Sequence, residues 1–175
     1  RGDPVPIGRK LADMGFQEDR NIADGPIRYL AGDISVEFLK QHKGDGRKQG
    51  DPYIPELDIA PQALPYLNIL LDRPVTRTFR GLGKITVPSM PAFMVHKLIV
   101  AGKRRDPAKK EKDLRQARAV GKVLSGDHDH LAELAAVFGG LHKTRKRMVV
   151  TSAREADQMI PGATAVFLQV LDGLE

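Results

Sequence analysis

The pattern of apolar and polar residues divides the chain into a strand-rich first half and a helical second half. Before residue 90, short runs of alternating apolar residues predict strands, and the turn residues between them predict hairpins. The predicted strands cover residues 27–30, 34–39, 75–79 and 84–87, and short helices are predicted at residues 6–14 and 63–71. In the second strand Ile34, Val36 and Phe38 share one face, so Glu37 lies on the other.

After Pro91, apolar residues recur at the three- and four-residue spacing of helices. The predicted helices cover residues 91–102, 108–124, 127–138, 142–159 and 163–174. Residues 41–51 hold no apolar side chain and predict a loop. Strands followed by helices, without βαβ alternation, favour an α+β fold.

Composition narrows the class of protein. With 175 residues and 41% hydrophobic side chains, the chain is able to bury a core. It has no cysteine, which excludes disulfides, thiolate–zinc sites and cysteine nucleophiles. No apolar run reaches the roughly 18 to 20 residues that a membrane helix needs, and the first residues do not form a signal peptide. We therefore expect a cytoplasmic protein with no membrane partner.

The positive charge is concentrated in two places. The formal net charge is +6, yet residues 97–122 alone hold ten basic and three acidic side chains. Residues 142–147 add four basic side chains and no acid. Such clusters favour a polyanionic partner, and the alternative is that they are solvated helix faces.

Three positions within this pattern are candidates for chemistry. Lys97 lies in a mostly apolar helix, so its ammonium either reaches the surface or faces an anion. Helical spacing places Lys97, Ala101 and Arg104 on one stripe, where the small alanine would let a phosphate approach both cations. Asp113 lies among many bases and is either a clamp that aims Lys97 or Arg104, or a weak surface ion pair.

Glu37 is the candidate acid of the first half. A carboxylate in the middle of a strand, opposite the apolar face, is suited to bind a metal or accept a proton. The alternative is that Glu37 belongs to the wet side of an amphipathic strand. The run Asp127-His128-Asp129-His130 is a weaker metal candidate, because alternate residues at a helix start do not share a face and Asp127 is explained as an N-cap.

Part of the sequence resembles a known family. Residues 84–100, KITVPSMPAFMVHKLIV, followed by Arg104-Arg105 and by residues 109–117, KKEKDLRQA, resemble the nucleotidyltransferase-like family of bacterial proteins. In that family a strand ending in Val-x-Val-Pro or similar leads into a helix with His-Lys-Leu, then Arg, then Lys-Asp-x-x-Gln-Ala. Residues 36–39, VEFL, and residues 63–67 resemble its third-acid strand and the helix after it. Nucleotidyltransferase toxins of bacterial toxin–antitoxin pairs are similar to the same series.

The resemblance implies the DNA polymerase β-type nucleotidyltransferase fold, with a mixed β-sheet followed by a C-terminal helical region. Residues 1–90 would be the C-terminal portion of the sheet subdomain and residues 91–175 a helical subdomain with basic helices. In such enzymes three acids hold two Mg²⁺ ions that bridge the triphosphate. Glu37 would be the third acid, a catalytic residue and metal ligand. Lys97 and Arg104 would contact the triphosphate, and Asp113 would organise these two cations.

The sequence departs from the family pattern in one respect. No Gly-Ser turn followed by Asp-x-Asp occurs before Glu37. Either this acidic pair precedes Arg1 in the complete gene product or the activity is lost, and the missing initiator methionine favours the first explanation.

The resemblance therefore implies Mg²⁺-dependent transfer of a nucleotidyl group from a nucleoside triphosphate, such as ATP, to an unknown acceptor. Both a protein and a nucleic acid, tRNA or another RNA, are candidate acceptors. The alternative is a catalytically inactive module of the same fold that binds nucleic acid or a partner protein. A third interpretation is a structural domain without a small-molecule site.

Overall fold

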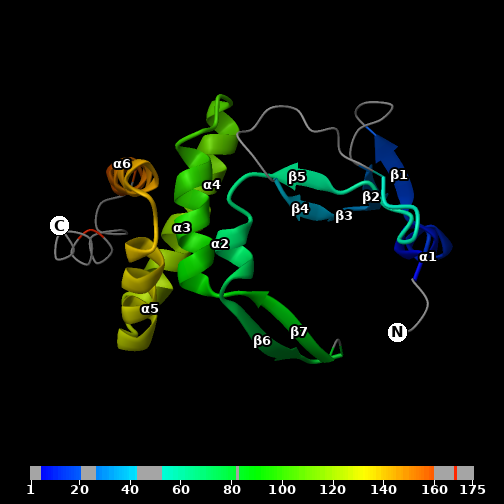
Figure 1. The fold of residues 1–175 in the computed structure, drawn as a ribbon, viewed down its shortest axis with the longest axis horizontal. Coiled ribbons are helices and arrows are strands. Elements are labelled where there is room, and N and C mark those ends of the chain that lie inside the picture. The colour runs from blue at the N-terminus through cyan, green and yellow to red at the C-terminus, as the bar shows by residue number, and fades with distance from the viewer. Residues whose placement is uncertain (1–4, 21–26, 43–52, 82, 160–167, 169–175) are drawn as a thin grey trace. The chain divides into compact units, whose positions relative to one another are not determined.

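The computed structural model describes residues 5–20, 27–42, 53–81, 83–159 and 168. The chain forms two compact units, residues 1–67 and residues 68–175. The boundary expected at residue 90 lies inside the second unit. The division into a sheet subdomain and a helical subdomain with separate roles stays a prediction. The α+β class expected from the sequence is confirmed, with strands in the first part and helices toward the end (Figure 1).

The first unit combines one helix with two small sheets, as far as its residues are described. Its elements are α1 (Ile7–Asp13), β1 (Gln17–Arg20), β2 (Ile27–Ala31), β3 (Ile34–Glu37), β4 (Leu39–Gln41) and β5 (Gln62–Leu64). Strands β1, β2 and β3 form an antiparallel sheet in that order, whereas β4 and β5 pair in parallel. The predicted hairpin of β2 and β3 is confirmed, with the positive-φ Gly32 in its turn.

Tyr29 is the centre of the core of this unit. Its side chain is fully buried, and its hydroxyl donates a hydrogen bond of 2.9 Å to the carbonyl oxygen of Asp58. The ring of Phe38 meets it edge-on at 5.9 Å between centroids. Buried Gly8 of α1 lies against the Tyr29 hydroxyl and the Asp58 carbonyl oxygen, and the Gly8 amide donates to the Leu57 carbonyl at 3.2 Å. Helix α1 therefore approaches this core at a position without a side chain.

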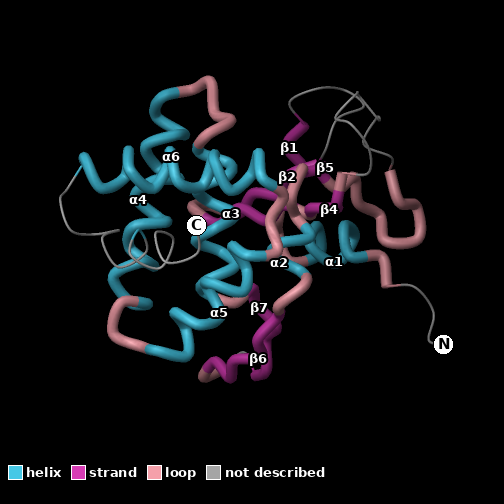
Figure 2. The backbone as a smooth tube through the Cα atoms, turned by 60° about the vertical axis from the view of Figure 1, so that its left-hand side comes forward, coloured by secondary structure: helices cyan, strands magenta, loops and turns pink. Residues whose placement is uncertain are grey.

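The second unit contains a β-ribbon and a group of helices. Its elements are α2 (Asn68–Leu71), β6 (Pro74–Phe79), β7 (Gly83–Pro88), α3 (Met90–Ala101), α4 (Pro107–Leu124), α5 (His128–Gly139) and α6 (Lys143–Met159). Strands β6 and β7 pair antiparallel and, among the described residues, pair with no other strand. Helix α3 packs against α4, α5 and α6, as Figures 1 and 2 show. None of the described helices combines the length and apolar character needed to cross a membrane.

The helices begin where the sequence provides caps. The hydroxyl of Ser89 accepts a hydrogen bond from the Ala92 amide at the start of α3. The carboxylates of Asp106 and Asp127 accept from amides in the first turns of α4 and α5. Each cap satisfies amides that have no partner within the helix. The interpretation of Asp127 as an N-cap is confirmed.

Some predicted elements differ from the structure. The helix expected at residues 63–71 is wrong in its first half, because residues 62–64 pair as β5 and only Asn68–Leu71 is helical. Strand β1 escaped prediction because Gln17-Glu18-Asp19-Arg20 contains no apolar residue. Apart from residue 168, which is helical, the helix expected at residues 163–174 lies outside the described residues. Most of the loop expected at residues 41–51 lies outside them as well.

Substitution of Gly8 by alanine will destabilise the first unit. A Cβ at this position would lie 1.9 Å from the Asp58 carbonyl oxygen and 2.6 Å from the Tyr29 hydroxyl, so α1 must shift. We expect a loss of about 1–3 kcal/mol in the free energy of unfolding.

Urea unfolding followed by tyrosine fluorescence measures this loss selectively, because all three tyrosines lie in residues 1–67 and the chain has no tryptophan. Arg9→Ala, at an exposed position of the same helix, is the control and should change the midpoint little. Equal midpoints for Gly8→Ala and Arg9→Ala would contradict the packing described here.

Candidate functional site

Two cations and one buried carboxylate meet between α3 and α4. The Nζ of Lys97 donates to Oδ1 of Asp113 at 2.9 Å, and the Nε of Arg104 donates to Oδ2 at 2.9 Å. The Asp113 side chain is 4% exposed, against 20% for Lys97 and 41% for Arg104. We call these three residues the Asp113 clamp. The interpretation of Asp113 as a weak surface ion pair is wrong, because its carboxylate is buried.

The fold of α4 explains why this carboxylate is buried. Leu114, Ala117 and Leu124 are all buried, together with Gly121, and they form the face of α4 that packs on its neighbours. Asp113 belongs to the same face and therefore enters the interface with α3. Lys97 is contributed by α3 itself, whereas Arg104 lies in the short connection after that helix.

The electrostatics of the clamp favour the ionised carboxylate. Burial alone raises the pKa of Asp113, but the hydrogen bonds from Arg104 and Lys97 and their charges outweigh it, so the pKa lies below its usual value. Two cations on one carboxylate leave the clamp with a net charge of +1.

The clamp also retains donors for a ligand. Arg104 contacts Asp113 through Nε, which leaves the two terminal nitrogens of its partly exposed guanidinium outside this bond. The Nζ of Lys97 lies 5.4 Å from the Phe93 ring centroid, so an aromatic face also limits its movement.

The arrangement corrects one detail of the expected phosphate site. Helical spacing suggested that Ala101 leaves room for a phosphate between Lys97 and Arg104. In the structure α3 ends at Ala101, whose side chain is fully buried, and the carboxylate of Asp113 fills the position between the cations. The exposed sides of the two cations are therefore the sides that remain accessible to an anion.

His96 lies beside the clamp without taking part in it. Its side chain is buried, and neither ring nitrogen has a hydrogen-bond partner among the described residues. Burial, followed by the charge of Lys97, lowers the pKa of His96 to about 4. The imidazole is therefore neutral at physiological pH and adds no charge beside Lys97.

Glu37 belongs to the other unit and has its own partner. It is the last residue of β3, rather than a mid-strand residue, and its side chain is exposed. Its Oε1 lies 4.0 Å from Nη1 of Arg28, which also binds Asp19. The strand register places Asp19, Arg28 and Glu37 opposite one another across β1, β2 and β3. Sequence reasoning missed Arg28, which the pairing of the predicted hairpin would have placed opposite Glu37.

The described residues do not form a site for two Mg²⁺ ions. Such a site needs several carboxylates that converge, and no group of three His, Cys, Asp or Glu residues in the described ranges is arranged to hold a metal. This includes Asp127 and its neighbours, so that candidate is not supported. The carboxylate of Glu37 faces a guanidinium, which competes with a cation for it.

Removal of the Asp113 charge will destabilise the second unit. We expect Asp113→Asn to lower the free energy of unfolding by about 2 kcal/mol near pH 7, because two hydrogen bonds from cations to a buried carboxylate are weakened. Since the folded-state pKa of Asp113 is lowered, this stabilisation is fully present above the unfolded-state pKa of about 4. It is lost as the pH falls through the folded-state pKa.

Thermal unfolding between pH 3 and pH 7, followed by circular dichroism, checks this expectation. The control is Glu111→Gln on the same helix, which removes an exposed ion pair with Arg115 and should cost at most about 0.5 kcal/mol. A pH-independent difference between wild type and Asp113→Asn would show that the ion pairs do not contribute.

Comparison with known proteins assigns the family. Residues 10–137 match the nucleotidyltransferase family, which is most of the chain and includes Glu37, Lys97, Arg104 and Asp113. Neither the curated proteins nor the solved structures include a significant match. The clamp lies in the matched region, and the segments between residues 36 and 117 that resemble the family fall within the same range. The chain therefore belongs to the nucleotidyltransferase family.

Proposed function

We propose that this chain binds the triphosphate of a nucleoside triphosphate through Lys97 and Arg104 and takes part in nucleotidyl transfer to an RNA or protein acceptor. The observation that carries the proposal is the clamp itself, in which a buried carboxylate fixes two cations and leaves them with a net positive charge. Fixed cations stabilise the negative charge that develops on phosphoryl oxygens, and they need no reorganisation during the reaction.

The roles of the three clamp residues follow from their exposure. Arg104 presents its terminal nitrogens to solvent and is suited to bind two phosphate oxygens at once. Lys97 is less exposed and supplies a localised charge. Asp113 is too buried to meet the nucleotide, so it positions the cations rather than binding the ligand.

The transfer reaction balances as a simple displacement. An acceptor hydroxyl oxygen bonds to the α-phosphorus as its proton passes to solvent, the bond from that phosphorus to the bridging oxygen breaks, and pyrophosphate leaves. Lys97 and Arg104 would stabilise the charge on the phosphate oxygens. We assign Glu37 as one of the catalytic carboxylates. For Glu37 to be a ligand of the two Mg²⁺ ions, further carboxylates are required, beyond those that the described residues bring together.

Triphosphate binding will depend on the clamp. We expect Arg104→Gln and Lys97→Met each to weaken the binding of a nucleoside triphosphate at least tenfold, because each removes a charge-assisted hydrogen bond worth about 1.5–3 kcal/mol. Isothermal titration calorimetry with ATP, GTP, CTP and UTP measures the effect. Lys112→Met, an exposed lysine of α4, is the control. Equal losses in the clamp and control variants would indicate diffuse charge rather than a site.

The position of the label distinguishes nucleotidyl transfer from other reactions of nucleoside triphosphates. We expect the full-length gene product, given Mg²⁺ and cell extract, to transfer label from α-labelled but not from γ-labelled triphosphate. Gel electrophoresis before and after ribonuclease or protease treatment identifies the acceptor. Glu37→Gln should abolish transfer, whereas Glu18→Gln, an exposed acid of the same sheet, should not. Transfer of the γ-label would instead indicate a phosphotransferase. Full activity of Glu37→Gln would show that Glu37 has no catalytic role and only forms an ion pair with Arg28.

A further inference from the structure

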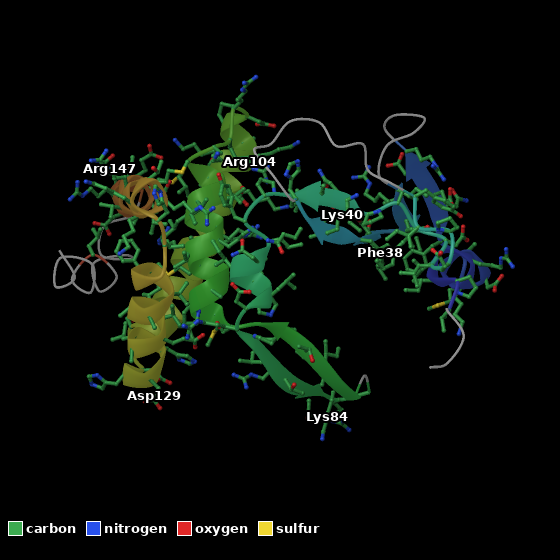
Figure 3. All side chains as sticks on the ribbon, viewed as in Figure 1. Phe38, Lys40, Lys84, Arg104, Asp129 and Arg147 are labelled. Atoms are coloured by element: carbon green, nitrogen blue, oxygen red, sulfur yellow. The ribbon has the colours of Figure 1, made fainter. Side chains whose placement is uncertain are left out.

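Helix α6 has two faces of opposite character. Its buried residues, Val149, Ser152, Ala153 and Ala156, form the face that packs inside the unit. The exposed residues Lys143, Arg147, Thr151 and Arg154 recur at the spacing of one helix face and lie on the other side. Figure 3 shows Arg147 on the side of α6 that points away from α3.

The exposed face borders a groove. The groove has a volume of about 490 Å³ and is lined by Lys143, Lys146, Arg147, Thr151 and Arg154, together with the apolar side chains of Phe138 and Val150. The Nζ of Lys146 lies 5.5 Å from the ring centroid of Phe138, which α5 contributes. An apolar floor beneath a row of cations makes this a shaped surface rather than a set of separate solvated lysines. We call it the α6 groove.

The charge of the groove is not neutralised within the described part of the chain. None of its four basic residues forms an ion pair with a described acid. The acid nearest in sequence to Arg154, Glu155, instead pairs with Lys110 of α4 at 2.7 Å. The groove therefore presents four positive charges, in contrast to the Asp113 clamp, where a buried carboxylate cancels one of two.

The length of the cationic row selects the class of ligand. Lys143 and Arg154 are separated by eleven residues, or about 16 Å along a helix. This exceeds the reach of one triphosphate, so simultaneous contact requires an anion with repeated charges. In a duplex each strand advances about 3.4 Å along the helix axis per phosphate, so about five nucleotides of such a strand span the row.

A membrane surface fits this face less well than a nucleic acid does. Helices that bind membranes expose large apolar residues beside their cations. Among the exposed large apolar residues of the structure only Met159 belongs to α6, and it is the last residue of the helix.

We propose that the α6 groove binds the phosphodiester backbone of a nucleic-acid strand. Lys143, Arg147 and Arg154 contact phosphates at intervals along the strand, Lys146 is held in the groove by Phe138, and the Thr151 hydroxyl donates to a phosphate oxygen. The inference goes beyond the proposed function, because neither Lys97 nor Arg104 belongs to the groove. It identifies a partner that binds whether or not nucleotidyl transfer takes place.

The dependence of binding on salt concentration tests the proposal. Fluorescence anisotropy with a labelled 20-nucleotide RNA, repeated from 50 to 300 mM KCl, yields the affinity and its salt slope. For single strands each neutralised phosphate contributes about 0.7 to the slope. Removal of two contacts in Lys143→Gln/Arg147→Gln should therefore reduce the slope by about 1.4 and weaken binding at least tenfold at 100 mM KCl. Thr151→Glu, which adds a negative charge without removing a cation, should weaken binding as well.

A control with the same net charge separates the groove from the rest of the surface. Lys112→Gln/Lys122→Gln removes two exposed charges from α4 and should change the affinity less than threefold. Equal losses in the α4 and α6 variants, or no binding of RNA or DNA by the wild type, would overturn the proposal. Binding of polyglutamate or phosphatidylserine vesicles as tight as that of nucleic acid would overturn it as well.

Two further measurements complete the test. The same titrations with DNA of matched sequence show whether the surface prefers RNA or DNA. Groove-dependent binding of either nucleic acid supports the proposal. The affinity of the α6 variants for nucleoside triphosphate should equal that of the wild type. Failure of triphosphate binding would therefore contradict the proposed function alone, and loss of groove-dependent nucleic-acid binding would contradict this inference alone.

Discussion

A carboxylate leaves water only when other charges and donors replace its hydration shell. Asp113 meets this requirement with a cation on each of its two oxygens, one from α3 and one from the connection that follows α3. The pairing fixes Lys97 and Arg104 relative to each other, and it ties the interface of α3 and α4 to the position of both cations. The packing of α3 on α4 and the proposed binding of a triphosphate therefore depend on the same three side chains.

The second unit uses positive charge in two different ways. At the clamp there are two partly buried cations, and Asp113 offsets the charge of one of them, so they suit a compact anion held in one orientation. In the α6 groove the cations, of which Lys146 alone is half-buried, follow one another over several helical turns, which suits an extended anion held in many registers. The contacts of α3 with both α4 and α6 join the two kinds of surface in one packed unit.

The sequence predicted the features that depend on local patterns and left out those that depend on pairing between distant residues. The helices of the second half follow from apolar spacing and caps such as Asp127. Helical spacing and charge singled out Lys97, Arg104 and Asp113, the family resemblance added their roles, and the structure brings the three together. Strand β5, in contrast, forms by pairing with β4, and its three residues show no alternation of apolar and polar side chains that would predict a strand. The burial of Asp113 was equally hidden, because many bases surround it in the sequence whereas two of them meet it in space.

The isolated ribbon of β6 and β7 has a consequence for self-association. Each strand pairs with the other alone within the described residues, so each keeps one edge whose backbone groups are open to pairing with another chain. Arg77 and Lys84 are exposed on it, and Pro74 and Pro88 lie opposite each other at its base. Two such ribbons placed edge to edge would bring like charges together, and each proline lacks the amide that a further strand would need. The ribbon thus carries its own protection against aggregation while its surface stays accessible.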